Sequence, residues 1–337
     1  MDETPKNENL SVDAFLKKYI LPFFFPAKVP NIGIIMFGAF GLSYLIQYGW
    51  QHFPEEQLFY EKTSLIGYTM VTLLRLLCLL LVFVLVTEHY KIKEHSTWGR
   101  NPGLGGFFIS FLVGVPAMLL STSMHNLFIY LELRLDNPLP RQLYYYVTEE
   151  QSLYGLLLTL LIGIALPILV EELFFRGLIV AVLPDRWYFR ILIPAILGTL
   201  FAVDRLEFIP LLLIGLCCSA VRFFTDSTLC SCLTRVGLFC SHTLLAPIIT
   251  EVEPGAAQNA MDYNRTVLYA SIIAAVLGVV MMLVLLKQLF FLRYLQKNED
   301  LKCDSPEGKA LPIPFYDHFH IDFLFGIAFL ILCWVTS

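Results

Sequence analysis

Residues 169–178 read LVEELFFRGL, which places two adjacent glutamates and an arginine inside an otherwise apolar stretch. The surrounding chain of 337 residues is 57% hydrophobic and only 15% charged, and its mean hydropathy is +0.68. Soluble globular domains are about half apolar and about a quarter charged, so this composition predicts an integral membrane protein. Charges at membrane depth are costly and by default mark a function or a buried pair.

Apolar runs long enough to cross a bilayer, which takes roughly 20 helical residues, recur along the chain. We predict an all-α fold, a polytopic transmembrane helix bundle of about nine spans. The predicted spans are residues 32–48, 64–87, 104–123, 153–170 (continuing to about 183), 190–203, 208–221, 229–249, 266–287 and 318–335. The fifth and sixth are short and separated only by the polar DRLE at 204–207, so they form either one bent pair or two tilted helices.

The distribution of Lys and Arg predicts the orientation, because cytoplasmic loops carry the excess of these residues. With nine spans and a cytoplasmic N-terminus, 16 of the 23 Lys and Arg residues fall on the cytoplasmic side and 5 on the other. We therefore expect a multi-pass protein whose C-terminus lies outside or in a lumen. No signal peptide is expected, and the amphipathic SVDAFLKKYILPFFF at 11–25 is interpreted as an interfacial anchor.

These features divide the chain into four parts. We expect an N-terminal cytoplasmic or interfacial segment (1–30), three transmembrane helices (31–149), a set of core helices (150–250), and two C-terminal transmembrane helices with a charged cytoplasmic loop (251–337).

The eight cysteines lie mostly in apolar spans, where a thiol behaves as a small hydrophobe, so they suggest no disulfide framework. The stretch CSCLTRVGLFCSH at 230–242 has zinc-ligand residue types, but on a helix they point in different directions and cannot converge. The cofactor therefore stays unknown, and a divalent metal finds no support in the sequence. The net charge of −5, without a basic tract, gives no reason to expect a nucleic-acid partner.

Ionisable residues inside or bordering the spans are the candidate functional residues. They are Arg75, Glu171, Glu172, Arg176, Asp204, Arg205, Arg235 and His242. For Arg75 and Arg235 a structural role is favoured, in which each pairs with a buried acid or snorkels to the interface.

The adjacent Glu171 and Glu172 differ from these isolated charges, because a low dielectric disfavours ionising two neighbouring carboxylates together. Arg176 follows Glu172 at i,i+4 on the helix, close enough to hold it ionised. One glutamate is then clamped, and Glu171 is free for proton chemistry. The alternative is an ion-paired helix end packed against its neighbours.

EELFFR at 171–176 resembles the EExxxR signature of the CAAX prenyl endopeptidase and bacteriocin-processing (CPBP, Abi-like) family, which are intramembrane proteases with a four-helix core. The family's FxxxH resembles FAVDR at 201–205, and its HxxxN or HxxxD resembles HTLLA at 242–246. The resemblance covers about residues 150–250 and implies a protease-like core within the bundle.

The resemblance also implies roles for individual residues. Glu171 would be the general base that activates water, and Glu172 with Arg176 would be its supporting pair. His242 would polarise the scissile carbonyl or stabilise the oxyanion.

Two positions depart from the family pattern, since Arg205 replaces a histidine and Ala246 replaces the asparagine. A guanidinium stays protonated and cannot act as a base, but it could pair with Glu171 and occupy its oxygens. That pairing conflicts with the predicted topology, which puts Arg205 in an outside loop and Glu171 toward the cytoplasmic end of its span. Losing one oxyanion donor costs about two to three orders of magnitude in rate. In the alternative, Arg205 itself stabilises the oxyanion while Glu171 and His242 transfer protons.

Three functions follow. The first is an intramembrane endopeptidase that acts on a prenylated or membrane-associated peptide. The second is a pseudoprotease that binds a lipidated or helical partner without cleavage, and the departures favour this one. The third, ranked lowest, is a transporter component, because no matched halves with broken helices occur. The expected partners are the lipid bilayer and a membrane peptide, and the oligomeric state is unknown.

Overall fold

The computed structural model describes residues 32–52, 65–134, 159–202, 208–245 and 265–303, together with residues 155, 157 and 249. Within these ranges the ordered elements are helices, and the only extended pairing is one antiparallel bridge between Gly99 and Ser227. The predicted all-α fold is therefore confirmed.

The helices vary widely in length. They are α3 (Ile32–His52), α4 (Leu65–Tyr90), α5 (Glu94–Trp98), α6 (Gly103–Arg134), η3 (Thr159–Ala165), α8 (Leu166–Glu172), η4 (Leu173–Ile179), α9 (Val180–Val182), α10 (Trp187–Ala202), α11 (Phe208–Thr225), α12 (Thr228–Leu245) and α14 (Arg265–Cys303). The four elements from η3 to α9 follow one another without a break, so residues 159–182 form one helical run. Its η3 and η4 turns are π-helical, a local widening that is frequent at functional sites.

Six described helices are long and apolar enough to cross a membrane, namely α3, α4, α6, α11, α12 and α14. The predicted count of nine spans is not confirmed by these six. The run at 159–182 is divided by its π-helical turns, and α10 is a shorter apolar helix of 16 residues. The predicted span at 318–335 and the interfacial segment at 1–30 lie outside the described residues.

The predicted fifth and sixth spans form two helices, α10 and α11, which pack against each other. Their contact is close at mid-length, where a Cβ on Gly215 would lie 3.1 Å from the Cα and the carbonyl oxygen of Ala195. The polar DRLE between them lies outside the described residues.

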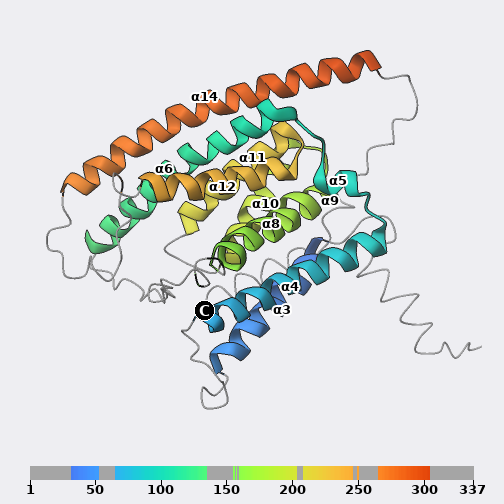
Figure 1. The fold of residues 1–337 in the computed structure, drawn as a ribbon, viewed down its shortest axis with the longest axis horizontal. Coiled ribbons are helices and arrows are strands. Elements are labelled where there is room, and N and C mark those ends of the chain that lie inside the picture. The colour runs from blue at the N-terminus through green and yellow to red at the C-terminus, as the bar shows by residue number, and fades with distance from the viewer. Residues whose placement is uncertain are drawn as a thin grey trace, which may run out of the picture.

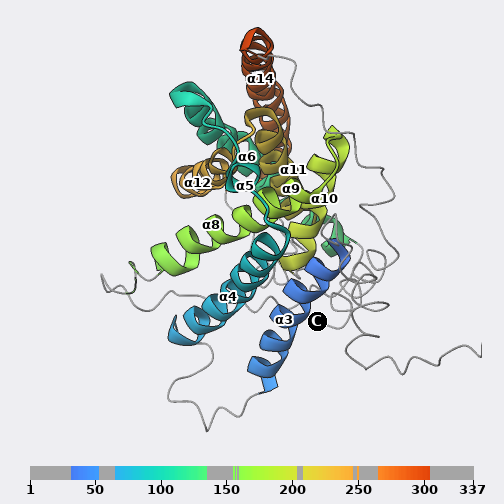
Figure 2. The ribbon, with the colours of Figure 1, turned by 90° about the vertical axis from the view of Figure 1, so that its right-hand side faces the viewer.

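The helical run at 159–182 lies inside the bundle. In Figure 1, α14 and α6 lie along one side, α3 and α4 lie on the opposite side, and the remaining long helices lie between them. Figure 2 shows the same order from the side, with α8 between α12 and α4. Contacts of α8 with both α12 and α4 support this placement. The segment that carries the two glutamates is therefore enclosed by helices from both sides.

Helices α6 and α12 touch backbone to backbone. A Cβ on Gly237 would lie only 2.0 Å from the carbonyl oxygen of Phe111, and one on Gly114 would lie 2.2 Å from the amide nitrogen of Leu238. Small residues allow such close approach of membrane helices. This contact fixes the rotation of α12 so that its polar residues Ser231 and Arg235 face α8.

Arg222 ties one end of the bundle together, and its side chain is almost fully buried. Its guanidinium donates to the backbone carbonyl of Arg176 (3.1 Å), to the Asp226 carboxylate (2.6 Å) and to the carbonyl of Ser96 (3.3 Å). Gly99 makes this packing feasible, because it has a φ of 77° and a Cβ there would lie 1.8 Å from the Asp226 carbonyl oxygen. The loop before α6 is thereby fastened to the turn between α11 and α12.

Candidate functional site

The LVEELFFRGL stretch lies near the middle of the helical run, not at its end. Glu171 precedes the last helical residue, Val182, by 11 positions, which is about 16 Å of helix. The helix continues through the π-helical turn of η4, as the predicted extension of this span to about residue 183 requires, and the side of the membrane that Glu171 is nearer to stays a prediction. The two glutamates lie near the middle of the helical run at 159–182.

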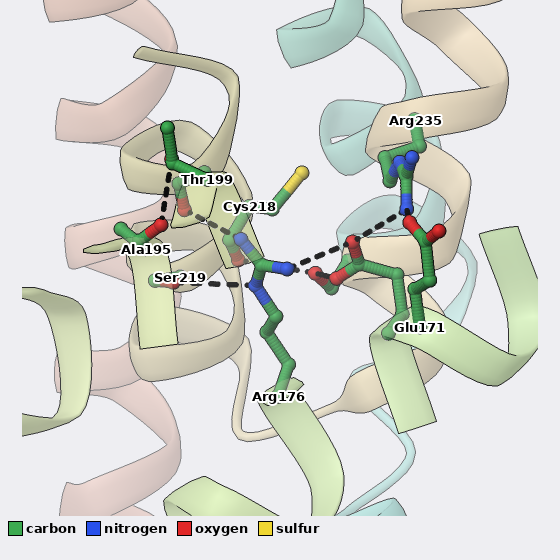
Figure 3. A network of polar contacts seen from close by, with 10 residues as sticks. Glu171, Arg176, Ala195, Thr199, Cys218, Ser219 and Arg235 are labelled. Atoms are coloured by element: carbon green, nitrogen blue, oxygen red, sulfur yellow. Dashed lines mark hydrogen bonds and ion pairs between the residues drawn. The ribbon is translucent and has the colours of Figure 1, made fainter. Parts of the chain in front are cut away.

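Glu172 and Arg176 form the pair that their i,i+4 spacing predicts, with 3.2 Å between Oε1 and Nη1. The Glu172 side chain has no exposed surface, and its second oxygen accepts a hydrogen bond from the Ser231 hydroxyl. Arg176 also donates to the Ser219 hydroxyl (3.3 Å), as Figure 3 shows. A further donor of Arg176 reaches the Gly215 carbonyl (3.1 Å). These contacts of the Glu172 carboxylate are all made inside the protein, so Glu172 is a structural centre of the site.

Glu171 is paired with Arg235, which extends from α12. The distance between Glu171 Oε2 and Arg235 Nη1 is 2.6 Å, and the same nitrogen lies 3.5 Å from Oε1 of Glu172 (Figure 3). The expectation that Glu171 is free is therefore wrong. The expectation that Arg235 pairs with a buried acid is confirmed. Because Glu171 is 25% exposed and Glu172 is fully buried, Glu171 is the more accessible of the two carboxylates.

A cavity of about 220 Å³ opens beside this network. It is lined by Arg75, Glu171, Glu172, Phe175, Arg176, Gly198, Thr199, Phe201, Leu211, Ile214, Gly215 and Arg235. One part of the wall is charged, and another part is aromatic and aliphatic. Such a mixture of an apolar wall with a few convergent polar groups is typical of ligand-binding sites.

Arg75 reaches this cavity from α4. Its guanidinium donates to the Ser43 hydroxyl (3.3 Å) and to the Phe201 carbonyl (3.2 Å), and it stacks on the Phe201 ring at 4.8 Å. Phe201 packs against Phe40 and Phe175 in an aromatic cluster that supports the apolar wall. Arg75 therefore faces the interior of the bundle.

The other predicted site residues are not seen to join the network. His242 lies on α12, seven residues after Arg235, and is half-buried. It is not among the described residues that line the cavity. Arg205 and Ala246 lie outside the described residues, so convergence of Glu171, Arg205 and His242 stays a prediction.

The roles of Arg75 and Arg235 as cavity residues were not predicted. The sequence did contain a sign that Arg235 belongs to the site. Arg235 and His242 are seven residues apart on α12, and a seven-residue separation returns to nearly the same face of a helix. If His242 faces the site, Arg235 must face the same side two turns earlier.

The polar groups at this site fit a metal cation poorly, because a guanidinium already lies against each carboxylate. In the part of the chain that the structure describes, no three His, Cys, Asp or Glu side chains lie close enough to share a metal ion. Which cofactor the protein uses therefore stays open.

The fold and the site define an integral, multi-pass membrane protein with a carboxylate–arginine network inside its helix bundle. Residues 153–240 match the family described as type II CAAX prenyl endopeptidase, Rce1-like, which confirms the resemblance seen in EELFFR. The CAAX-protease-like part of this membrane protein is therefore the segment 153–240. The matched segment contains both glutamates and Arg235, but neither Arg75 nor His242. No curated protein and no solved structure matched the chain.

Proposed function

We propose that this chain is a non-catalytic relative of the CAAX endopeptidases, a pseudoprotease that binds a prenylated or helical membrane peptide in its cavity and does not cleave it. Its N-terminus and the loop after α14 lie in the cytoplasm in this proposal, following the Lys and Arg distribution.

One observation carries the proposal: Arg235 lies 2.6 Å from Glu171. By resemblance, Glu171 is the base that activates water. A base must keep an oxygen available within hydrogen-bond reach of that water. Here one oxygen accepts a charge-assisted hydrogen bond, which is about twice as strong as a neutral one. The water must therefore compete with a guanidinium that α12 holds in place.

The family pattern adds two further obstacles. Arg205 stands where the pattern has a histidine, and Ala246 where it has an asparagine. Arginine cannot take a proton at a working pH, and alanine offers no donor to an oxyanion. The cavity is nevertheless present, and α10 and α11 approach each other closely beside it at Gly215.

A catalytic alternative is favoured by one observation, the 25% exposure of Glu171. In that alternative Glu171 activates water and Arg235 stabilises the oxyanion. Both alternatives use the same residues and differ only in whether the bound peptide is cleaved. A cleavage assay therefore separates them.

The experiment uses the purified full-length protein in lipid nanodiscs. A farnesylated peptide that carries a photo-crosslinker is added, and the products are identified by mass spectrometry. We expect crosslinking of the intact peptide without cleavage above the level of a Glu171→Gln variant. Glu94→Gln is the matched control, because Glu94 is an exposed glutamate away from the cavity. Cleavage by the native protein that is lost in Glu171→Gln and kept in Glu94→Gln would overturn the proposal.

A further inference from the structure

Arg293 lies on the later part of α14, outside the segment that matches the Rce1-like family. It is the last residue but one of the apolar span Val267–Tyr294, so we expect its guanidinium at the level where this span meets the lipid headgroups. Tyr294 beside it and Trp187 at the start of α10 are more than half exposed, and tyrosine and tryptophan are enriched at that level of a membrane. Arg293 is therefore a basic residue at one end of the helix bundle.

The last turn of α11 holds the Arg293 side chain in place. Arg293 donates a hydrogen bond to the backbone carbonyl of Phe223, and its guanidinium lies 3.9 Å from the centroid of the Phe223 ring. Three residues earlier on α14, Phe290 packs edge-on against Phe224, with 6.1 Å between the ring centroids. A carbonyl and an aromatic ring are neutral groups, so these contacts orient the guanidinium and leave its charge in place.

Arg293 belongs to a group of charges that has a surplus of arginines. It lies within electrostatic range of Arg190 and Arg222 and of the carboxylates of Asp185 and Asp226. Each carboxylate is already paired with another arginine, since Asp185 lies 3.0 Å from Arg190 and Asp226 lies 2.6 Å from Arg222. Within the part of the chain that the structure describes, no carboxylate lies within ion-pair distance of Arg293. The three arginines and two aspartates of this group thus leave one net positive charge.

A guanidinium in this setting suits a phosphate group. It presents five N–H donors in a planar fork that matches phosphate oxygens, and the Phe223 carbonyl accepts from only one of its nitrogens. On the same helix, Phe290 and Phe291 expose 59% and 58% of their surface within the apolar span. A phospholipid has both a phosphate for the arginine and acyl chains for these aromatic side chains, whereas a soluble phosphate has only the first.

We propose that Arg293 binds the phosphate of an anionic phospholipid in the membrane leaflet at this end of the bundle. The acyl chains of the lipid lie against Phe290 and Phe291, and the surplus positive charge favours a headgroup with a net negative charge. This binding site is separate from the cavity beside Glu171, so the proposal stands whether or not that cavity cleaves a peptide.

The test uses native mass spectrometry to count the lipids bound to the purified full-length protein in nonionic detergent. Two lipids with the same acyl chains are titrated: phosphatidylglycerol, which carries one negative charge, and phosphatidylcholine, whose choline cation balances the phosphate. We expect phosphatidylglycerol to bind about 5-fold more tightly, the effect of one basic residue at an anionic membrane surface. Arg293→Gln should bind the two lipids equally. Arg293→Lys keeps the charge but loses the planar fork, so it should keep part of the preference.

Lys91→Gln is the matched control. Lys91 is exposed and directly follows α4, which lies on the side of the bundle opposite α14 (Figure 1). The loop that begins with Lys91 reaches the turn between α11 and α12 through the bridge of Gly99 with Ser227, so both basic residues belong to the same end of the bundle. This variant removes the same charge from that end and should keep the full preference for phosphatidylglycerol.

Three results would overturn the proposal. The first is equal binding of the two lipids, or binding of neither, by the native protein. The second is an equal loss of the preference in Lys91→Gln and Arg293→Gln, which would mean that the overall charge of this end attracts the lipid. The third concerns glycerophosphoglycerol, the same headgroup without acyl chains: if it binds the native protein as tightly as the lipid, and Arg293→Gln abolishes this binding, the ligand is a soluble phosphate. Much weaker binding of this headgroup than of phosphatidylglycerol supports the phospholipid.

Discussion

Replacing Arg176 by methionine should destabilise the protein strongly, because the substitution leaves a fully buried carboxylate without its nearest partner. Glu172 has no exposed surface and lies 3.2 Å from Arg176. Removing one member of a buried ion pair costs about 3–5 kcal/mol. Arg235 remains 3.5 Å from Glu172 and offsets part of this loss, so we expect about 3 kcal/mol.

A second substitution sharpens the prediction. In the double variant Glu172→Met with Arg176→Met the buried charge itself is removed, and apolar replacement of a buried pair is often close to neutral. The double variant should therefore be more stable than Arg176→Met alone. Unfolding in detergent micelles, followed by tryptophan fluorescence, gives the free energies. Arg186→Met is the control, because Arg186 is exposed and donates to the Tyr188 hydroxyl.

Two results would refute this reasoning. One is a stability of Arg176→Met equal to that of Arg186→Met. The other is a double variant that is less stable than Arg176→Met, which would mean that Glu172 keeps its stabilising role without the arginine.

Three further predictions concern packing, topology and chemistry. Gly237→Ala should cost about 1–3 kcal/mol through overpacking, because its Cβ would lie 2.0 Å from a backbone oxygen of α6, whereas Gly105→Ala, with nothing within 4 Å, should not destabilise the protein in the same unfolding assay. A single cysteine introduced at position 300 should react with an impermeant maleimide only from the cytoplasmic side, and reaction from the other side would contradict the predicted orientation. The double change Arg205→His with Ala246→Asn restores the family's residues but should not by itself confer peptidase activity, since the Arg235 contact still occupies the glutamate; product peptides in mass spectrometry would show that this contact does not block the site.

Local spacing predicted the part of the site that lies within one helix. The pair of Glu172 and Arg176 follows from i,i+4 geometry alone, which holds in any α-helical or slightly widened turn. Hydropathy also predicted that this span continues to about residue 183, close to its observed end at Val182. The π-helical turns within it did not follow, because hydropathy does not distinguish one hydrogen-bonding pattern of a helical turn from another.

The contacts between distant helices were beyond sequence reasoning. Arg235 is 64 residues from Glu171, and its approach depends on the glycine contact between α6 and α12, which sets the rotation of α12. Arg75 is 126 residues from Phe201, and only its charge at membrane depth marked it. Periodicity predicts which face of a helix carries the charged side chains, but not which other helix packs against that face.

Arg235 holds Glu171 as an ion pair inside the cavity. A double-mutant cycle with Glu171→Gln, Arg235→Gln and the double variant measures the coupling between the two side chains in unfolding free energy. Both side chains are about one-quarter exposed, so we expect a favourable coupling of about 1–3 kcal/mol, within the range for residues in direct contact. A coupling below about 0.5 kcal/mol, the range of additive and independent sites, would show that Arg235 does not hold Glu171.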